Sequence, residues 1–322
     1  MLLRLLNWAP EVERNESVVQ TAPVAPHDIA RPLSVVTWNV QYAGTRRKRF
    51  FYDGGAETFA DAQDVREALA AIRAVLSELA SEGLDIALLQ ELDRDSDRTG
   101  RVDQLAQLAT DWPNWVTTPY YRSRFVPFPM PPKRPLGRID LHEAILARCA
   151  LGGSRRLPLP LLQEPPLRRS FNLHRAILTS RLPLSDGRYL HVGCTHLSAF
   201  SRGDGTMLRQ VEAIRRWMGE CGDDPFLIGG DFNLLAPGDD PRRLGAAAGE
   251  YVEDVITLLD GVAQRVPRLG EHTYLPPGAT GPDRTLDHIF VSPGVTIEAH
   301  RVVPVPPWLS DHWPLYVRVR VA

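Results

Sequence analysis

Cysteine is scarce in this sequence, and long hydrophobic runs are missing from it. Cys149, Cys194 and Cys221 are too few and too widely spaced for a disulfide framework or a CxxC metal site, so we expect reduced, buried thiols. No segment approaches the roughly 20 apolar residues that span a bilayer, and residues 1–10 do not follow a signal-peptide pattern. We therefore expect a cytoplasmic protein with no membrane span.

Lysine is rare, and the net charge is close to zero. Of the 37 basic residues only Lys48 and Lys133 are lysines, and the formal net charge is -2 at pH 7. A chain with this charge balance exerts no overall attraction on nucleic acid, so any such role must come from local patches. The many arginines matter chemically, because a guanidinium group can hold a phosphate through two hydrogen bonds.

The composition is sufficient for a large folded domain. The chain has 322 residues and is 43% hydrophobic, which allows a substantial core. Residues 1–31 mix charges with prolines and show no periodicity, so we interpret them as an N-terminal extension. Residues 32–322 contain no linker and no internal repeat, and we expect them to form one layered α/β domain.

Strand-like and helix-like segments alternate along this domain. Apolar runs predict strands at 33–40, 84–89, 144–147, 172–179, 189–195, 225–228, 285–292, 295–303 and 313–319. Helical spacing of apolar residues predicts helices at 61–80 and 206–218, with a shorter helical pattern ending near 109. A turn at Asp186 and Gly187 makes a hairpin, so the sheet is not purely parallel. Residues 120–166 are dense in proline and arginine and are otherwise interpreted as long surface loops.

Polar side chains recur at the ends of these apolar strands. If the ends converge, they supply one pocket with carboxylates, amides and imidazoles. The residues are Asn39, Glu91, His196, Asp231, Asn233, Asp287, Asp311 and His312.

Such a set suits a hard divalent cation. Oxygen ligands favour Mg²⁺ or Mn²⁺, whereas zinc would favour thiolates or several imidazoles. A carboxylate beside an imidazole fixes its tautomer and stabilises its charged form, so Asp287 or Asp311 can pair with His312, and Glu91 with His196. An oriented water, charge stabilisation and help for the leaving group are what phosphoester hydrolysis needs.

At these residues the sequence resembles the endonuclease/exonuclease/phosphatase superfamily, which contains deoxyribonuclease I, exonuclease III, neutral sphingomyelinases and inositol phosphate phosphatases. The matching segments follow the family order: TWNVQ at 37–41, LLQELD at 88–93, THL at 195–197, GGDFN at 229–233, LDHIF at 286–290 and SDHWP at 310–314. Weaker matches are EAILAR at 143–148 and HTY at 272–274. The resemblance implies a four-layer α/β sandwich, in which two packed mixed β-sheets are flanked by helices.

The resemblance also implies roles for individual residues. Glu91 would bind the metal with Asn39 beside it, and Asp311 is a further candidate ligand. Asp231 and Asn233 would activate and orient the attacking water.

Three further residues would act on the phosphate itself. His312, supported by Asp287 or Asp311, would contact the scissile phosphate and stabilise its charge. His196 would be a further phosphate contact or a general acid, and we also expect Arg175 to bind substrate. A histidine at position 196, together with Gln41 and Tyr42 in the first motif, departs from the abasic-site repair branch.

The sequence therefore predicts a monomeric, divalent-metal-dependent phosphoesterase that acts on nucleic acid or on a small or lipid phosphodiester. A sphingomyelinase-like enzyme and an inositol phosphate phosphatase remain open within that class. A non-catalytic binding module with the same fold is the alternative from another class, although no site residue is missing. A serine or cysteine hydrolase is disfavoured, since there is no GxSxG motif.

Overall fold

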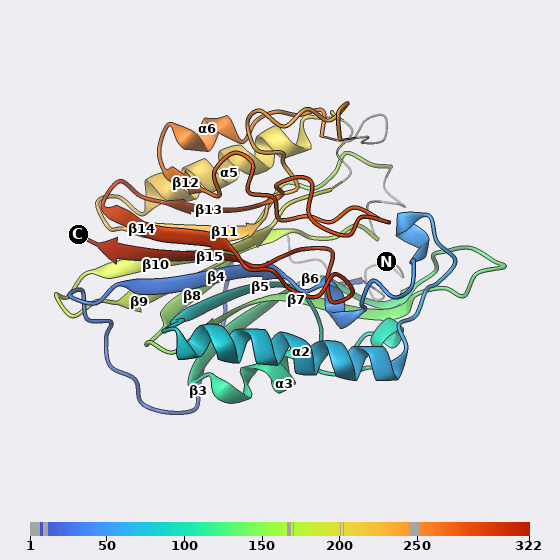
Figure 1. Cartoon of the computed structure of the whole chain (residues 1–322), viewed down its shortest axis with the longest axis horizontal. Coiled ribbons are helices and arrows are strands. Elements are labelled where there is room, and N and C mark those ends of the chain that lie inside the picture. The colour runs from blue at the N-terminus through green and yellow to red at the C-terminus, as the bar shows by residue number, and fades with distance from the viewer. Residues whose placement is uncertain are drawn as a thin grey trace.

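Two β-sheets form the centre of the computed structural model, which describes residues 7–8, 12–165, 169, 171–199, 201, 203–244 and 251–322 (Figure 1). In these residues sheet A has eight strands and sheet B has seven. Sheet A runs in the order β1 (Asn7–Trp8), β6 (Asn114–Val126), β7 (Gly137–Ala147), β5 (Ile86–Asp93), β4 (Leu33–Asn39), β15 (Leu315–Val321) and β14 (Val295–Val302), and β3 (Val19–Gln20) also pairs with β6. Sheet B runs in the order β12 (Gln264–Val266), β13 (Asp287–Val291), β11 (Phe226–Asp231), β10 (Tyr189–His196), β9 (Ala176–Pro183), β8 (Gly152–Pro158) and β2 (Arg14–Asn15).

Both sheets are mixed. β4 is parallel to β5 in sheet A, and β10 is parallel to β11 in sheet B, while the other described pairings are antiparallel. The turn at Asp186 and Gly187 joins β9 to β10 as an antiparallel hairpin, as predicted. The carboxyl ends of the parallel strands β4 and β5 point the same way, as do those of β10 and β11, so polar residues that follow them gather at one end.

Alternation along the strands separates the layers. In β4, Val35 faces sheet B and belongs to the apolar core between the sheets, whereas Val36 and Trp38 face the helices outside. The helices α2 (Ala62–Ser81) and α3 (Gln104–Leu108) cover sheet A, and α5 (Thr206–Glu220) and α6 (Thr257–Asp260) cover sheet B (Figure 1). The predicted four-layer α/β sandwich is confirmed.

The helices form where apolar residues recur at helical spacing. In α2, Val65, Leu69, Ile72 and Leu76 are buried on one face against sheet A. Gly83 follows the helix with a φ of 97°, a conformation that favours glycine and ends the helical path.

The middle of the chain corrects one prediction. Residues 120–166 were expected to be mainly long surface loops, but β6, β7 and β8 lie there. β7 pairs with both β5 and β6 and is central to sheet A. The prediction rested on the density of proline and arginine in this stretch, which did not prevent strands from forming. The β6–β7 pairing also shifts register between Pro119 and Tyr121, so β6 accommodates Pro119 at an irregularity.

The N-terminal segment adds short strands to both sheets. β2 pairs with β8 of sheet B, and β3 pairs with β6 of sheet A. Parts of the predicted extension, residues 1–6 and 9–11, lie outside the described residues. Its division from the domain at residue 32 stays a prediction.

The three cysteines are buried and unpaired with one another. Burial raises the pKa of Cys194 and of Cys149 well above the ordinary thiol value and raises the pKa of Cys221 to about 12. Within the described residues, no helix is both long enough and apolar enough to cross a bilayer.

Candidate active site

Strand ends from the two sheets meet at one end of the sandwich. β4 ends at Asn39 and β11 ends at Asp231, and the Asn39 amide nitrogen donates a hydrogen bond to Asp231 Oδ2 at 3.0 Å. This approach depends on Gly229, since a Cβ there would lie 2.9 Å from Leu88 Cδ1 and 3.4 Å from Thr37 Cβ. Glycine at this position lets the sheets come close enough for their polar ends to share one buried space.

Glu91 enters this space through an irregularity in β5. It has a φ of 60°, and the pairing of β5 with β7 shifts register between Leu89 and Leu92. Simple alternation would place Glu91 on the face of Leu89, which packs under the helices. The bulge instead turns Glu91 inward, where Asn39 Nδ2 donates to its Oε1 at 3.2 Å. A left-handed backbone at a non-glycine residue costs stability, and such residues cluster at functional sites.

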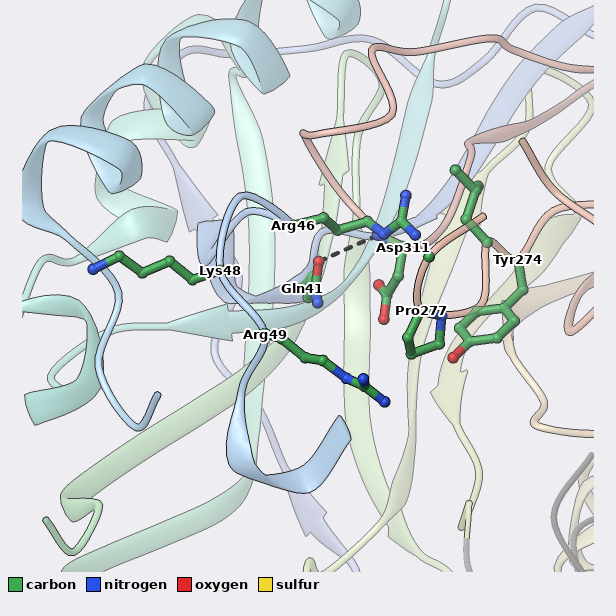
Figure 2. Close-up of a pocket in the computed structure, with 9 residues that line it drawn as sticks. Gln41, Arg46, Lys48, Arg49, Tyr274, Pro277 and Asp311 are labelled. Carbon is green, nitrogen blue, oxygen red and sulfur yellow. Dashed lines mark hydrogen bonds between the residues drawn. The ribbon is translucent and has the colours of Figure 1, made fainter. Parts of the chain in front are cut away.

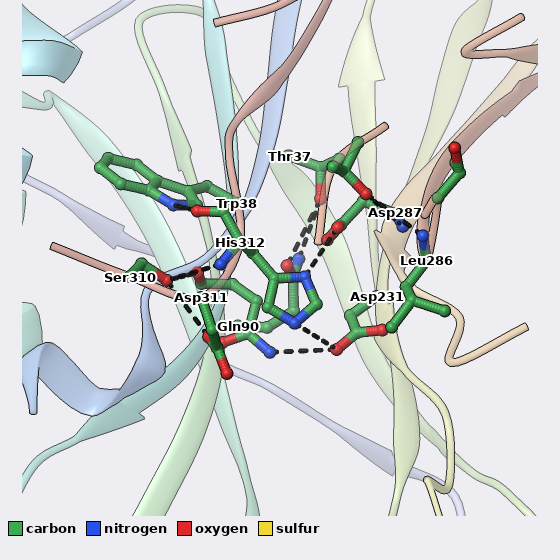
Figure 3. Close-up of polar contacts among 12 residues, drawn as sticks. Thr37, Trp38, Gln90, Asp231, Leu286, Asp287, Ser310, Asp311 and His312 are labelled. Carbon is green, nitrogen blue, oxygen red and sulfur yellow. Dashed lines mark hydrogen bonds and ion pairs between the residues drawn. The ribbon is translucent and has the colours of Figure 1, made fainter. Parts of the chain in front are cut away.

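His312 lies between two carboxylates (Figure 3). Its Nδ1 donates to Asp287 Oδ2 at 2.7 Å, and its Nε2 lies 3.6 Å from Asp231 Oδ2. Burial opposes the charged form, but the carboxylates of Asp287 and Asp231 raise the pKa of His312 well above its ordinary value. The ring is therefore a buried imidazolium at neutral pH.

The segment that carries His312 is held by hydrogen bonds on both sides. Ser310 Oγ donates to the Asn39 carbonyl at 2.8 Å and accepts from the His312 amide at 3.1 Å. Trp38 Nε1 donates to the His312 carbonyl at 2.9 Å. These contacts tie the loop before β15 to the end of β4, so the imidazole position is set by the strand.

Asp231 is the acceptor at the centre of the site. Burial raises the pKa of Asp231 to about 6, with His312 opposing the shift and Asp287 adding to it. Its Oδ1 accepts from the Asn233 amide at 2.9 Å. The Asn233 side chain donates to the Leu197 carbonyl at 3.1 Å, and Asn233 has a φ of 49°, so this turn is also locally strained.

His196 approaches Asp231 from β10. Its Nε2 lies 3.2 Å from Asp231 Oδ2, and its Nδ1 lies 3.4 Å from the Tyr120 hydroxyl and 3.9 Å from Glu91 Oε1. Burial, Arg175 and His312 lower the pKa of His196 well below the ordinary value, so the ring is neutral. The carboxylate at Nε2 requires the proton there, which leaves Nδ1 as the acceptor for the Tyr120 hydroxyl.

Asp311 lies on another side of the site. Its amide donates to Gln41 Oε1 at 3.2 Å, and its side chain borders a small cavity of about 90 Å³ (Figure 2). Arg46 and Arg49 extend toward this cavity, whereas Lys48 points away from it. Of the two carboxylates predicted to support His312, Asp287 is the one that contacts the imidazole nitrogen.

Arg175, the predicted substrate-binding arginine, lies behind His196. It is only 6% exposed, and its guanidinium carbon lies 5.0 Å from the centre of the Tyr120 ring. The fully buried Glu143 lies further inside. Burial raises the pKa of Glu143 well above its ordinary value, although Arg156 and Arg175 oppose the shift. The arginine thus supplies positive charge next to the neutral imidazole.

The site offers ligand atoms that suit a divalent cation. Ligand atoms of Asp231, Asp287 and His312 all lie within 4.8 Å of one another, so this group could hold a metal ion if His312 gave up a proton, since an imidazolium has no free lone pair. Asp287 Oδ1 is buried and receives no hydrogen bond from any described residue, which leaves a carboxylate oxygen available. Glu91 and Asn39 lie beside the same space, and an oxygen-rich set fits Mg²⁺ or Mn²⁺. The assignment of Asn39, Glu91 and Asp311 as ligands stays a prediction.

Sequence reasoning missed several residues that shape the site. Tyr120 contacts His196, Gln41 Oε1 receives the Asp311 amide, and Thr273 Oγ1 accepts from the Asp287 amide at 3.1 Å. Tyr120 was overlooked because its strand was interpreted as a loop, although the apolar alternation from residue 114 onward was a usable signal. Thr273 lies in the HTY segment, which was noted only because it resembles a segment of the family.

The two mixed sheets and the polar site between their ends define the deoxyribonuclease I-like class of α/β sandwich. A model described as the Endonuclease/Exonuclease/phosphatase family matches residues 36–312, which is most of the chain. The chain therefore belongs to this family. No significant sequence match was found among curated proteins.

Solved structures share the fold at low sequence identity. An endonuclease/exonuclease/phosphatase from Beutenbergia cavernae is 21% identical, with a TM-score of 0.61 over 91% of this chain and 72% of that chain. TDP2 from D. rerio, solved with a single-strand DNA product, is 18% identical, with a TM-score of 0.54 over 89% and 98%. A mannosyl-6-phosphatase from Bacteroides thetaiotaomicron is 15% identical, with a TM-score of 0.55 over 89% and 99%. At these identities the likeness supports the fold alone.

Proposed function

We propose that the protein is a divalent-metal-dependent phosphodiester hydrolase that uses water as the nucleophile. The observation that carries the proposal is a buried carboxylate oxygen, Asp231 Oδ2, that lies 3.2 Å from the neutral His196 ring and 3.6 Å from the charged His312 ring. Burying ionisable groups costs stability, and perturbed titratable groups gathered in one site are typical of catalysis. Membership of a family of phosphoesterases supports the same reading.

Each side chain suits one part of the reaction. Asp231 accepts a proton from the attacking water, because its raised pKa makes it a better base than an exposed carboxylate. The His312 imidazolium stabilises the negative charge that develops on the phosphate, and Asp287 keeps the ring charged and oriented. His196 presents Nε2–H as a donor, while Asn233 lies beside Asp231 to orient the water.

A Mg²⁺ or Mn²⁺ ion, when bound, would polarise the phosphate oxygens and lower the pKa of a bound water. Glu91 is the residue we propose as its main ligand, with Asn39 and Asp311 nearby. The strained backbone at Glu91, which turns this carboxylate into the site, supports that assignment.

Turnover of bis-p-nitrophenyl phosphate tests the proposal directly. We expect hydrolysis with Mg²⁺ or Mn²⁺, loss of activity with EDTA, and recovery on adding the metal back. H312A and E91Q should each lose at least about a hundredfold in kcat. H191Q is a matched control. His191 Nε2 lies 3.4 Å from Asp224 Oδ2 and the pair is outside the site, so this variant should keep full activity.

Inactivity with every metal would contradict the proposal and favour a binding module. The substrate class is separated by one parallel assay of double- and single-stranded DNA, RNA, sphingomyelin and inositol phosphates at fixed salt and Mg²⁺. The single-strand DNA product belongs to TDP2, so single-stranded DNA enters this panel as a candidate only.

A further inference from the structure

The hairpin between β6 and β7 presents large apolar side chains to solvent. Phe125 is 47% exposed, Phe128 is 42% exposed and Met130 is 63% exposed. Scattered single apolar residues are normal on a surface, but three on one short hairpin tip form a patch. The tip defined by residues 124–134 is called the hairpin tip below.

The charge of the hairpin tip is of one sign. Residues 112–139 contain five basic residues and no aspartate or glutamate. At the base, Arg122 pairs with Asp140 and Arg138 pairs with Asp95. At the tip, Arg124, Lys133 and Arg134 form no ion pair within 4.0 Å of any described carboxylate, although Arg134 is near enough to Asp97 to lower the pKa of that carboxyl.

Residues of the hairpin tip itself contact the rest of the molecule. Lys133 Nζ donates to the Gly55 carbonyl at 2.7 Å, and the Arg134 guanidinium lies over the Phe59 ring at 4.2 Å. Phe128 also makes an edge contact with Phe171, with ring centroids 6.1 Å apart. These contacts hold the tip against Gly55, Phe59 and Phe171, while Phe125 and Met130 stay exposed.

We propose that the hairpin tip binds the surface of an anionic lipid bilayer. Phenylalanine and methionine would enter the boundary between headgroups and acyl chains, while Arg124, Lys133 and Arg134 would contact acidic headgroups. A single-stranded nucleic acid is the less favoured partner. Base stacking needs flat aromatic faces, and Met130, the most exposed of the three, offers none.

The hairpin lies at the same end of the molecule as the candidate active site. In Figure 1 the hairpin extends beyond the end of the sandwich where β4 finishes, which is the end that carries the candidate active site. Its base packs with Tyr42, which lies in the segment directly after β4. A bilayer bound at the tip would therefore lie at the active-site end of the molecule.

Co-sedimentation with lipid vesicles tests the proposal on the full chain. We expect binding to vesicles of phosphatidylcholine with 30% phosphatidylserine (about a third anionic lipid) and weak binding to phosphatidylcholine alone. F125E/M130E should reduce binding at least about tenfold, and R124Q/K133Q should reduce it by about fivefold per charge removed. L269E is the matched control, because Leu269 is 70% exposed but lies outside the hairpin, and it should bind like the wild type.

Three results would overturn the proposal: no binding to anionic vesicles, equal loss in L269E and F125E/M130E, or tip-dependent binding of single-stranded DNA without vesicle binding. Far-ultraviolet circular dichroism checks that each variant is folded. The hydrolysis of bis-p-nitrophenyl phosphate should be unchanged in all of them, so the outcome is independent of the proposed catalytic activity.

Discussion

The two ends of β10 face the same buried space between the sheets and carry opposite chemistry. At its start, Leu190 lies in the apolar core, and at its end, His196 lies in the polar site. Both side chains are almost completely buried. Burial of Leu190 stabilises the fold, whereas burial of His196 costs free energy and shifts its pKa. The same strand therefore contributes stability at one end and reactivity at the other.

The strongest test of this contrast is at Asp231, the β11 carboxylate that His196 contacts at the polar end of β10. D231N should lower kcat by about a thousandfold, since the acceptor for the water proton is lost. Its urea midpoint should stay equal or rise, because an amide is cheaper to bury than a carboxylate. Steady-state kinetics and urea unfolding measure both quantities. If D231N lost much stability but kept its activity, the polar end would have to be assigned to stability and not to catalysis.

The apolar end should respond in the opposite way. L190A removes a fully buried side chain from the core and should lower the free energy of unfolding by about 2–5 kcal/mol. At temperatures where the variant is folded, its kcat should match the wild type. Chemical denaturation and steady-state kinetics on the same preparation measure both quantities. A loss of kcat in folded L190A would mean that the apolar end of β10 also affects the active site.

A smaller effect should come from the residue that holds His196. Y120F removes the hydroxyl that donates to His196 Nδ1 and should lower kcat about three- to tenfold, which corresponds to one neutral hydrogen bond. Nitrogen-15 NMR should show a changed chemical shift at His196 Nδ1, where the hydrogen bond is lost, while Asp231 keeps the proton on Nε2. Tyr121 is also buried and serves as the control in Y121F. An unchanged Nδ1 shift in Y120F would exclude this role.

The smallest effect concerns a buried histidine outside the site. Burial lowers the pKa of His142 below its ordinary value of 6.5, although Asp140 at 2.9 Å opposes the shift. The unfolded chain therefore binds the proton more readily, and stability is lost as the pH falls below 6.5. Urea unfolding measured from pH 7.5 to 5 should show that the free energy of unfolding falls less steeply with pH in H142Q than in the wild type. An equal dependence on pH in both proteins would show that His142 makes no contribution.

How much of the fold was predictable depended on the regularity of each segment. β4 is a continuous β-rich apolar run and α2 has a clear period of 3.6, and both were predicted to within a few residues. β8, with the sequence GGSRRLP, was missed because arginines favour a surface loop. Arg156 is fully buried, and it donates to the His174 carbonyl at 2.6 Å, so tertiary contacts rather than local pattern decide this strand.

The site was predictable as a set of residues but not as a geometry. Motif order brought Asn39, Asp231 and His312 to attention, and the structure brings them together. The bulge that turns Glu91 inward and the choice of Asp287 over Asp311 at the imidazole have no local signal. Both depend on contacts between segments that are far apart in the sequence.

The burial of all three cysteines has a practical consequence. Alkylating reagents attack the thiolate, and each native thiol is both shielded and hard to ionise. A cysteine introduced at position 130 would therefore be the favoured site for a fluorescent maleimide. Its emission could then report the polarity around the hairpin without prior removal of the native cysteines.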